Sequence, residues 1–410
     1  MENTKKRILI IGINYSPELT GIGKYTGEML EWLAENGYLC TVITSFPYYP
    51  NWKVQEPYSG RLFKKEIYKN GDIIVYRCPF YVPENPSGLK RMIHEASFFA
   101  SSFFQIIPLL FKQKNQHIFC IAPPFHLGFL ALFYKFFKGG KINYHIQDLQ
   151  IEAARDLKVV NSNFIFNILF GMEKFILKRV DSISSISVGM RKKISDKTAR
   201  VILNFPNWVD TNKFFPISDK DKIKTIWGYK HSDKIVLYSG SIGEKQGLEA
   251  LIDIAIQCLN HTDINFIICG NGPNRQNLEN LAISKGASNL KFMPLQSNEK
   301  FNEFLNLADI HLVLQKSEAS DLVMPSKLTT ILASGGLVIA TAIEGTSLFN
   351  EIFDNKMGIV IPPEDNLKLK EAILQACNQD YSEIQANAKR YANQFLNMNS
   401  ILSQMEKSIL

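Results

Sequence analysis

Short apolar runs rich in Ile and Val alternate with longer amphipathic stretches along the first half of the chain. Continuously apolar runs of this length are typical of strands in a parallel sheet that is buried on both faces, and the stretches between them have helical spacing. One such stretch, residues 24–36, ends at Gly37, a residue type that commonly closes a helix. The apolar runs are residues 7–13, 40–45, 73–77, 117–122 and 141–146. The pattern predicts a series of βαβ units.

The same alternation starts again in the second half of the chain. Its apolar runs are residues 235–240, 265–270, 290–294, 309–315, 336–341 and 358–362. Between the two series, a segment after residue 203 is rich in Pro, Asn and charged residues, as interdomain linkers often are. We therefore predict an α/β protein of two Rossmann-like doubly wound domains in tandem.

Composition agrees with a folded, multidomain chain. The 410 residues are 46% hydrophobic, which excludes disordered and fibrous classes. Six cysteines lie far apart without a C-x-x-C pair, so we expect buried thiols in a reducing compartment rather than disulfides or a zinc site. Two apolar stretches, residues 98–111 and 118–137, are too short or too interrupted for a membrane span and are expected to form a buried or interfacial helix.

Charge is distributed unevenly along the chain. Residues 1–200 contain 27 Lys and Arg against 16 Asp and Glu, whereas residues 201–410 contain 19 against 23. A basic half favours an anionic partner such as a membrane surface, a phosphorylated lipid or nucleic acid, although ordinary solvated surface also explains such an excess.

Ligands of open α/β sheets bind outside the carboxyl ends of the strands, so the loops after the predicted strands are the places to search. After the first strand, Gly21 and Gly23 open a helix whose N-terminus suits a phosphate, or they serve only the backbone turn. After the run 141–146, His145 and Asp148 suit acid-base chemistry on a hydroxyl, or are a structural histidine and a helix N-cap.

The second half has two further loops of interest. In residues 238–249, Gly240, Gly243 and Gly247 leave room around the backbone near Lys245. A lysine in this position favours a role in binding a departing diphosphate over that of an ordinary solvated surface lysine. The segment 317–336 carries polar groups that suit hydroxyl or phosphate binding, or that are surface charges. These are Glu318, Asp321, Ser326 and Lys327. Another tight loop, residues 269–273, is expected to be structural.

No metal cofactor is expected. The seven histidines form no H-x-x-x-H or His/Cys cluster, and the one D-x-D, at Asp219 and Asp221, lies in the linker rather than after a strand.

Taken together, seven segments resemble glycosyltransferases of family 4, which have the GT-B fold, and within them a bacterial subgroup of colanic-acid, capsule and O-antigen synthesis that includes fucosyltransferases. The segments are residues 14–29, 46–54, 145–149, 206–210, 238–249, 270–273 and 324–336. The resemblance implies two Rossmann-like domains facing a cleft, with residues 1–203 for the acceptor and 204–388 for a nucleotide-sugar donor. Residues 389–410 would form a helix that returns to the N-terminal domain.

The resemblance also implies roles for single residues. Asp148, Lys245 and His145 are the predicted catalytic group, with Asp148 near the reacting sugar and Lys245 on the leaving diphosphate. Ser241 replaces an arginine common in the family, and Thr330 replaces the later of two glutamates seven residues apart. The predicted donor-binding set is Gly21, Gly23, Ser241, Gly243, Gly247, Glu318, Asp321, Ser326, Lys327 and Thr330.

The expected reaction is a retaining, metal-independent transfer to a polyprenyl-diphosphate-linked glycan, with GDP-fucose as the first donor to try. The aromatic loop 46–52 and the basic, phenylalanine-rich segment 90–114 would then face the inner leaflet of the cytoplasmic membrane, although a core helix with scattered lysines has the same pattern. No nucleic acid is expected as a partner. The altered Ser241 and Thr330 positions leave open a catalytically silent, nucleotide-binding scaffold of a polysaccharide assembly complex.

Overall fold

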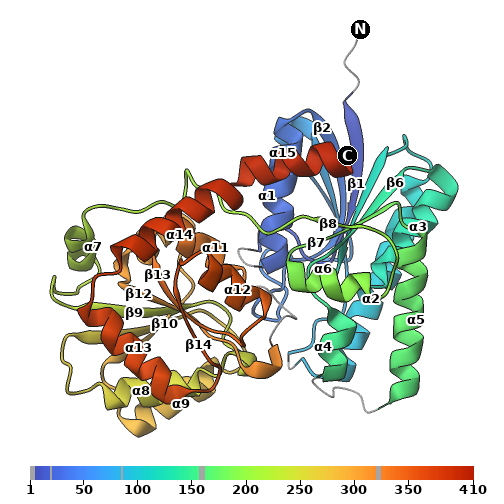
Figure 1. The fold of residues 1–410 in the computed structure, drawn as a ribbon. Helices are drawn as coiled ribbons and strands as arrows, with labels where there is room; N and C mark the ends of the chain where they lie inside the picture. Colours follow the sequence, from blue (N-terminus) through green and yellow to red (C-terminus); the bar gives the residue numbers. More distant parts are fainter. Residues whose placement is uncertain (1–4, 19–20, 85, 157–161, 320–324) are drawn as a thin grey trace. The chain divides into compact units, whose positions relative to one another are not determined.

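The computed structural model describes residues 5–18, 21–84, 86–156, 162–319 and 325–410. The chain forms two compact units, one of residues 1–206 with 402–410 and one of residues 207–401. Each unit is built around a mainly parallel sheet with helices on its faces, as Figure 1 shows. The two predicted Rossmann-like domains are confirmed.

In the first unit, eight described strands form a sheet in the order β3-β4-β2-β1-β5-β6-β7-β8. The strands are β1 (Lys6–Ile11), β2 (Tyr38–Ser45), β3 (Lys64–Tyr68), β4 (Ile73–Cys78), β5 (His117–Ala122), β6 (Lys141–Ile146), β7 (Ser182–Ser185) and β8 (Ile202–Asn204). The central strands β1 and β5 are buried almost throughout, which explains their continuous apolar runs. The edge strand β3 pairs antiparallel with β4 and is mostly exposed and polar, so the apolar pattern did not predict it.

The helices of this unit connect successive strands. They are α1 (Gly21–Glu35), α2 (Gly88–Leu109), α3 (Leu127–Lys138), α4 (Gln150–Asp156), α5 (Asn163–Arg179), α6 (Val188–Ser195) and the short 3₁₀ turn η1 (Lys69–Gly71). Helix α2 packs on α3, and α3 packs on α5, so these three lie side by side. No described helix combines the length and the apolar character that crossing a bilayer requires.

In the second unit, six described strands form a fully parallel sheet in the order β11-β10-β9-β12-β13-β14. They are β9 (Lys234–Ser239), β10 (Ile264–Cys269), β11 (Leu290–Met293), β12 (Ile310–Val313), β13 (Leu337–Thr341) and β14 (Ile359–Ile361). The surrounding helices are α7 (Lys220–Ile226), α8 (Glu249–Gln257), α9 (Arg275–Lys285), α10 (Phe301–Leu307), α11 (Lys327–Ala333), α12 (Ser347–Asp354), α13 (Asn366–Asn378) and α14 (Ser382–Phe395), with 3₁₀ turns η2 (Glu244–Gln246) and η3 (Ser317–Ala319).

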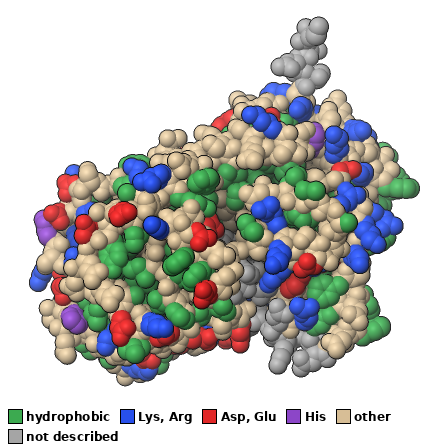
Figure 2. All heavy atoms as spheres, in the orientation of Figure 1, with side chains coloured by type: hydrophobic (Ala, Val, Ile, Leu, Met, Phe, Trp, Pro, Cys, Tyr) green, Lys and Arg blue, Asp and Glu red, His purple; other side chains and the backbone are tan. Residues whose placement is uncertain are grey.

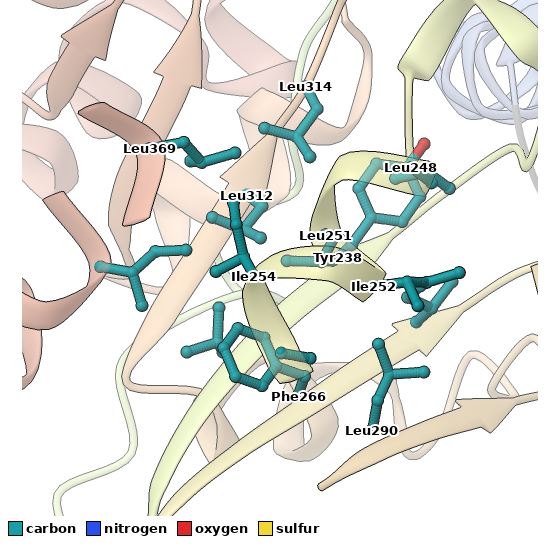
Figure 3. Packing of buried hydrophobic residues seen from close by; sticks show 14 of the residues in the cluster. Tyr238, Leu248, Leu251, Ile252, Ile254, Phe266, Leu290, Leu312, Leu314 and Leu369 are labelled. Atoms are coloured by element: carbon teal, nitrogen blue, oxygen red, sulfur yellow. The ribbon is translucent and has the colours of Figure 1, made fainter. Parts of the chain in front are cut away.

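Side chains of this sheet alternate between two buried clusters. In β9, Val236 and Tyr238 belong to one cluster, whereas Ile235 and Leu237 belong to the other. Figure 3 shows the first cluster, in which Tyr238 lies close to Leu248 and to Leu251 of α8. Burial on both faces is the physical reason for the continuous apolar runs in this half of the sequence.

The C-terminal segment consists of two helices rather than one. Helix α14 ends at Phe395 and α15 (Met398–Ile409) follows, with residues 402–410 packed in the first unit. There the Tyr38 hydroxyl donates a 2.9 Å hydrogen bond to Glu406 Oε1.

The loops after β9 and β10 approach each other so closely that one glycine is required. The Gly240 N–H donates to the Cys269 carbonyl at 2.9 Å, and a Cβ atom on Gly270 would overlap the Gly240 carbonyl oxygen. Gly270 also has a φ of +152°.

We expect Gly270→Ala to lower the free energy of unfolding by more than about 3 kcal/mol, because steric overlap adds to backbone strain. Gly286→Ala is the matched control. Gly286 has a φ of +73° with nothing within 4 Å of an added Cβ, so strain alone applies and the loss should be about 1 kcal/mol. Urea unfolding of both variants measures the difference. Equal losses would contradict the close approach of the two loops.

Candidate functional site

A buried carboxylate joins two strand-end loops of the first unit. Glu18, after β1, is only 3% exposed. Its Oε1 accepts hydrogen bonds from the Tyr48 and Tyr49 N–H groups at 3.1 and 3.0 Å, and its Oε2 accepts one from Asn14 Nδ2 at 2.9 Å. Burial raises the pKa of Glu18 to about 7, although these hydrogen bonds favour the ionised form. The aromatic loop 46–52 is therefore fixed to the loop that precedes α1.

A buried guanidinium joins the same region from the other side. Arg77, in β4, is 1% exposed and pairs with Glu66, its Nε lying 2.6 Å from Glu66 Oε2. Its Nη1 and Nη2 donate to the carbonyls of Ser45 at 3.2 Å and Ser16 at 2.6 Å. Arg77 thus connects the carboxyl ends of β1, β2 and β4.

The two predicted glycines lie where α1 begins over this carboxylate. Gly21 has a φ of +61°, and a Cβ on Gly23 would lie 2.5 Å from Glu18 Oε2. Gly23 is therefore required by the close approach of Glu18. The approach of these glycines to a diphosphate stays a prediction.

His145 and Asp148 have different surroundings. His145 lies within β6, 2% exposed, with Nδ1 2.9 Å from Ser184 Oγ and its ring against Phe119 and Phe205. Burial lowers the pKa of His145 to about 3, so the imidazole is neutral at physiological pH. These are the surroundings of a structural histidine. Asp148 is half-buried in the turn between β6 and α4, at the strand end where a ligand is expected.

A second carboxylate near Asp148 has no motif in the sequence. Glu95, from α2, accepts hydrogen bonds from Gln150 Nε2 at 2.6 and 2.7 Å, and Gln150 Oε1 accepts one from the Phe125 N–H at 3.2 Å. Burial raises the pKa of Glu95 to about 7, and the charge of Asp148 acts in the same direction. Two carboxylates, of which Glu95 has a raised pKa, therefore lie near the end of β6.

In the second unit, lysines surround the glycine-rich loop after β9. Lys245 is half-buried in η2, and its carbonyl accepts a 2.9 Å hydrogen bond from the Lys316 N–H. The side chain of Lys316 lies against Gly247, which ends η2 with a φ of +63°. Gly243 donates its N–H to Gln246 Oε1 at 3.0 Å. Lys316 was not among the predicted residues, because it follows β12 without a glycine or a helix start to mark it.

Lys327, the first residue of α11, is the most unusual cation near this loop. Its Nζ is buried 3.5 Å from the centre of the Tyr238 ring and, among the residues that the structure describes, has no hydrogen-bond partner. Burial lowers the pKa of Lys327 to about 7. Tyr238 in turn donates its hydroxyl to the carbonyl of the exposed Ser241 at 2.6 Å. One tyrosine thus positions both the loop and the buried ammonium.

The other predicted donor residues do not all present side chains to this loop. Thr330 is buried in α11, and its hydroxyl donates to the Lys327 carbonyl at 3.0 Å. Ser326 is half-buried directly before α11, and its carbonyl accepts from the Thr329 hydroxyl at 3.0 Å. Glu318 is exposed in η3, and Asp321 lies outside the described residues. No group of three or more His, Cys, Asp or Glu side chains within the described ranges could hold a metal ion.

Comparisons with known proteins place the chain in a family. Residues 219–395 match the model of "Glycosyl transferases group 1". The Escherichia coli K12 protein WcaI, assigned to colanic acid biosynthesis as a glycosyl transferase, is 38% identical over 98% of this chain and 99% of its own length. The chain belongs to the glycosyl transferases of group 1.

Solved structures agree with this glycosyltransferase assignment at the level of the fold. Sucrose-phosphate synthase from Thermosynechococcus elongatus has a TM-score of 0.77 at 16% identity, covering 98% of each chain. HepE from Anabaena, in complex with UDP and glucose, has a TM-score of 0.71 at 14% identity, covering 98% of this chain and 99% of its own. The GT-B fold expected from the resemblance is confirmed for this glycosyltransferase.

We expect the stability of this glycosyltransferase to depend on the proton of Glu18. The folded protein keeps it up to about pH 7, whereas an exposed glutamate releases it near 4.5, so the free energy of unfolding should fall as pH rises between these values. Glu18→Gln should remove up to about 3 kcal/mol of that fall. Urea unfolding at several pH values measures it, with the exposed Glu31→Gln as control. An unchanged slope in Glu18→Gln would show that Glu18 ionises normally.

Proposed function

We propose that this glycosyltransferase moves a hexose-type sugar from a nucleotide diphosphate onto a polyprenyl-diphosphate-linked glycan of an exopolysaccharide, capsule or O-antigen. The assignment of WcaI to colanic acid biosynthesis supports a product of this class. GDP-fucose is the first donor to try. The transfer is retaining and needs no metal ion, and it takes place at the inner face of the cytoplasmic membrane, where a polyprenyl carrier presents its sugar.

The observation that carries this proposal is the group of three lysines around the loop after β9. Lys245, Lys316 and Lys327 lie around a chain kept slim by glycines, and the buried Lys327 ammonium lacks an anionic partner among the described residues. Burying a cation without a counter-charge costs free energy, and a diphosphate supplies that charge. HepE, whose fold this chain shares, is described with UDP and glucose bound.

The chemistry assigns different tasks to these lysines. When the bond between the sugar's anomeric carbon and the diphosphate oxygen breaks, negative charge grows on the leaving diphosphate. Lys245, half-buried on a short 3₁₀ turn, stabilises that charge. Lys327 holds the donor in place. Together with Lys316, it supplies the positive charge that is missing because position 241 is a serine rather than an arginine.

In the first unit, the polar groups at the end of β6 serve the acceptor. Asp148 lies near the reacting sugar. Glu95 and Gln150 accept hydrogen bonds from the hydroxyl groups of the acceptor. A carboxyl group with a pKa of about 7, such as Glu95, can also take up the proton that the acceptor hydroxyl releases.

The experiment that tests the function is turnover of purified protein with GDP-fucose and a panel of UDP-sugars on a synthetic polyprenyl-diphosphate-linked acceptor. Product mass shows the transfer, and the anomeric configuration of the product shows retention or inversion. Transfer should persist in EDTA, and its loss on chelation would contradict a metal-free mechanism. Binding of nucleotide without any turnover would favour the silent scaffold instead.

Replacing the lysine of η2 should slow the chemical step. Lys245→Ala is expected to lower kcat by roughly 10- to 1000-fold, because a preorganised cation for the leaving group is lost. Lys222→Ala, an exposed lysine of α7, is the control and should leave kcat unchanged. A normal kcat for Lys245→Ala in steady-state assays would remove Lys245 from the catalytic group.

Binding of the leaving nucleotide should be coupled to protonation of Lys327. Above pH 7 the buried amine is largely neutral, and a bound diphosphate favours its charged form. Calorimetry at pH 8 in buffers of different ionisation enthalpy should show uptake of close to one proton, with affinity falling up to about tenfold per pH unit.

Lys327→Met should abolish both the proton uptake and the pH dependence. The same uptake in this variant as in the wild type would mean that another group takes the proton, and that Lys327 does not contact the diphosphate.

A further inference from the structure

An outward stripe of α2 is apolar along the whole helix, beside the exposed Lys90 and Arg91 of its first turn. Its exposed residues include Leu89, Ile93, Phe104 and Ile107, and Phe111 directly after the helix is 87% exposed. A helix on the surface of a soluble protein normally presents polar residues outward. This face of α2 therefore calls for a covering surface.

Ring contacts extend the apolar surface from α2 onto α3. Phe104 contacts Phe103 with ring centres 6.2 Å apart, and Phe103 contacts Phe133 of α3 at 5.0 Å. Phe133 contacts Phe137, and Phe137 contacts Phe136, both at 5.0 Å. Phe104 and Phe136, at the two ends of this chain of rings, are 66% and 81% exposed.

Helix α5 continues the surface on the other side of α3. Phe129 of α3 contacts Phe175 of α5 at 5.8 Å. Phe164, Ile168 and Phe175 are exposed at spacings that place them on one side of α5. We call the exposed apolar residues of α2, α3 and α5, with Phe111, the phenylalanine face.

The charges exposed around this face are predominantly positive. Exposed or half-buried basic residues on the three helices include Lys90, Arg91, Lys138, Lys174, Lys178 and Arg179. The same helices carry two glutamates. Glu95 is held by Gln150, and Glu173 is buried against Lys197. Asp181, after α5, pairs with Lys135 at 2.7 Å. Figure 2 shows basic and hydrophobic side chains next to each other where Figure 1 draws α5.

We infer that the phenylalanine face docks this glycosyltransferase onto an anionic lipid bilayer. Phenylalanines enter the boundary between headgroups and acyl chains, and the surrounding lysines and arginines contact lipid phosphates. A second copy of the chain fits less well, because pairing the face with itself would bring basic residues against basic residues. The inference rests on the proposed function in one respect: a lipid-linked acceptor gives the enzyme a reason to dock.

Flotation with vesicles tests the docking directly. The wild-type protein should float with vesicles that contain phosphatidylglycerol, and raising the salt concentration should lower that binding at least tenfold, because screening weakens the phosphate contacts. Vesicles of phosphatidylcholine alone should bind it at least tenfold more weakly. Equal binding to both vesicle types, or none to either, would overturn the inference.

Matched double variants locate the docking surface. Phe104→Ser with Phe136→Ser should lower vesicle binding at least tenfold, whereas Phe353→Ser with Phe395→Ser, at exposed positions of the second unit, should not change it. Lys174→Glu with Lys178→Glu should also lower it, compared with Lys222→Glu and Lys356→Glu. Equal effects of test and control pairs would overturn the inference. A different result would overturn it as well: a wild-type protein that binds no vesicles but forms a dimer by light scattering, with that dimer lost in the phenylalanine variant.

Turnover separates this inference from the proposed function. The phenylalanine variant should transfer sugar to a soluble, short-chain acceptor analogue at the wild-type rate, and should lose at least tenfold with an acceptor embedded in vesicles. If the wild-type protein binds vesicles but transfers no sugar to either acceptor, the proposed function is contradicted and the inference about the docking face is not. Wild-type rates of the variant with the embedded acceptor would overturn the role of docking in the reaction.

Discussion

Two buried side chains, Glu18 and Arg77, connect the strand ends of the first unit, and the positions of the loops around them depend on these contacts. Both side chains are almost completely buried, and each makes three hydrogen bonds. Those of Glu18 are to Asn14, Tyr48 and Tyr49, and those of Arg77 are to Ser16, Ser45 and Glu66. A buried polar group without hydrogen bonds costs free energy, and a buried charge costs more, so these contacts hold the two side chains in place. They determine where α1 begins and where the aromatic loop 46–52 lies. Position 23 must therefore be a glycine, because a side chain there would displace the Glu18 carboxylate.

The second unit uses burial differently. The Lys327 ammonium lies over the Tyr238 ring without a hydrogen-bond partner among the described residues, and burial lowers its pKa to about 7. A cation in this condition is stabilised by any anion that enters the loop, and the free energy gained on pairing adds to the affinity for that anion. The glycines at 240 and 270 permit the two loops to approach each other above this lysine. Structural glycines and a buried ammonium therefore belong to one arrangement.

Much of the fold could be predicted because parallel strands buried on both faces produce uninterrupted apolar runs. The strands β1, β9 and β10 are examples. The edge strand β3 could not be predicted in this way, since it is exposed and polar. Of the site, Lys245 and Lys327 could be recognised beside glycines or a helix start. Glu18 and Glu95 could not be assigned, because their partners lie about 30 and 55 residues away in sequence. For His145, the sequence left a structural role open, and its burial against Ser184, Phe119 and Phe205 favours that role.

Hydrogen exchange of backbone amides with and without nucleotide tests the central claim, that the loop after β9, with the lysines around it, receives the donor's diphosphate. The protein would be incubated with GDP, UDP and ADP in turn, without added metal. The account predicts that at least one of them slows exchange in residues 240–247 and in the adjoining loop 270–274, while the face of α5 exchanges as before. Slower exchange confined to other segments, with the 240–247 loop unaffected by every nucleotide, would contradict it.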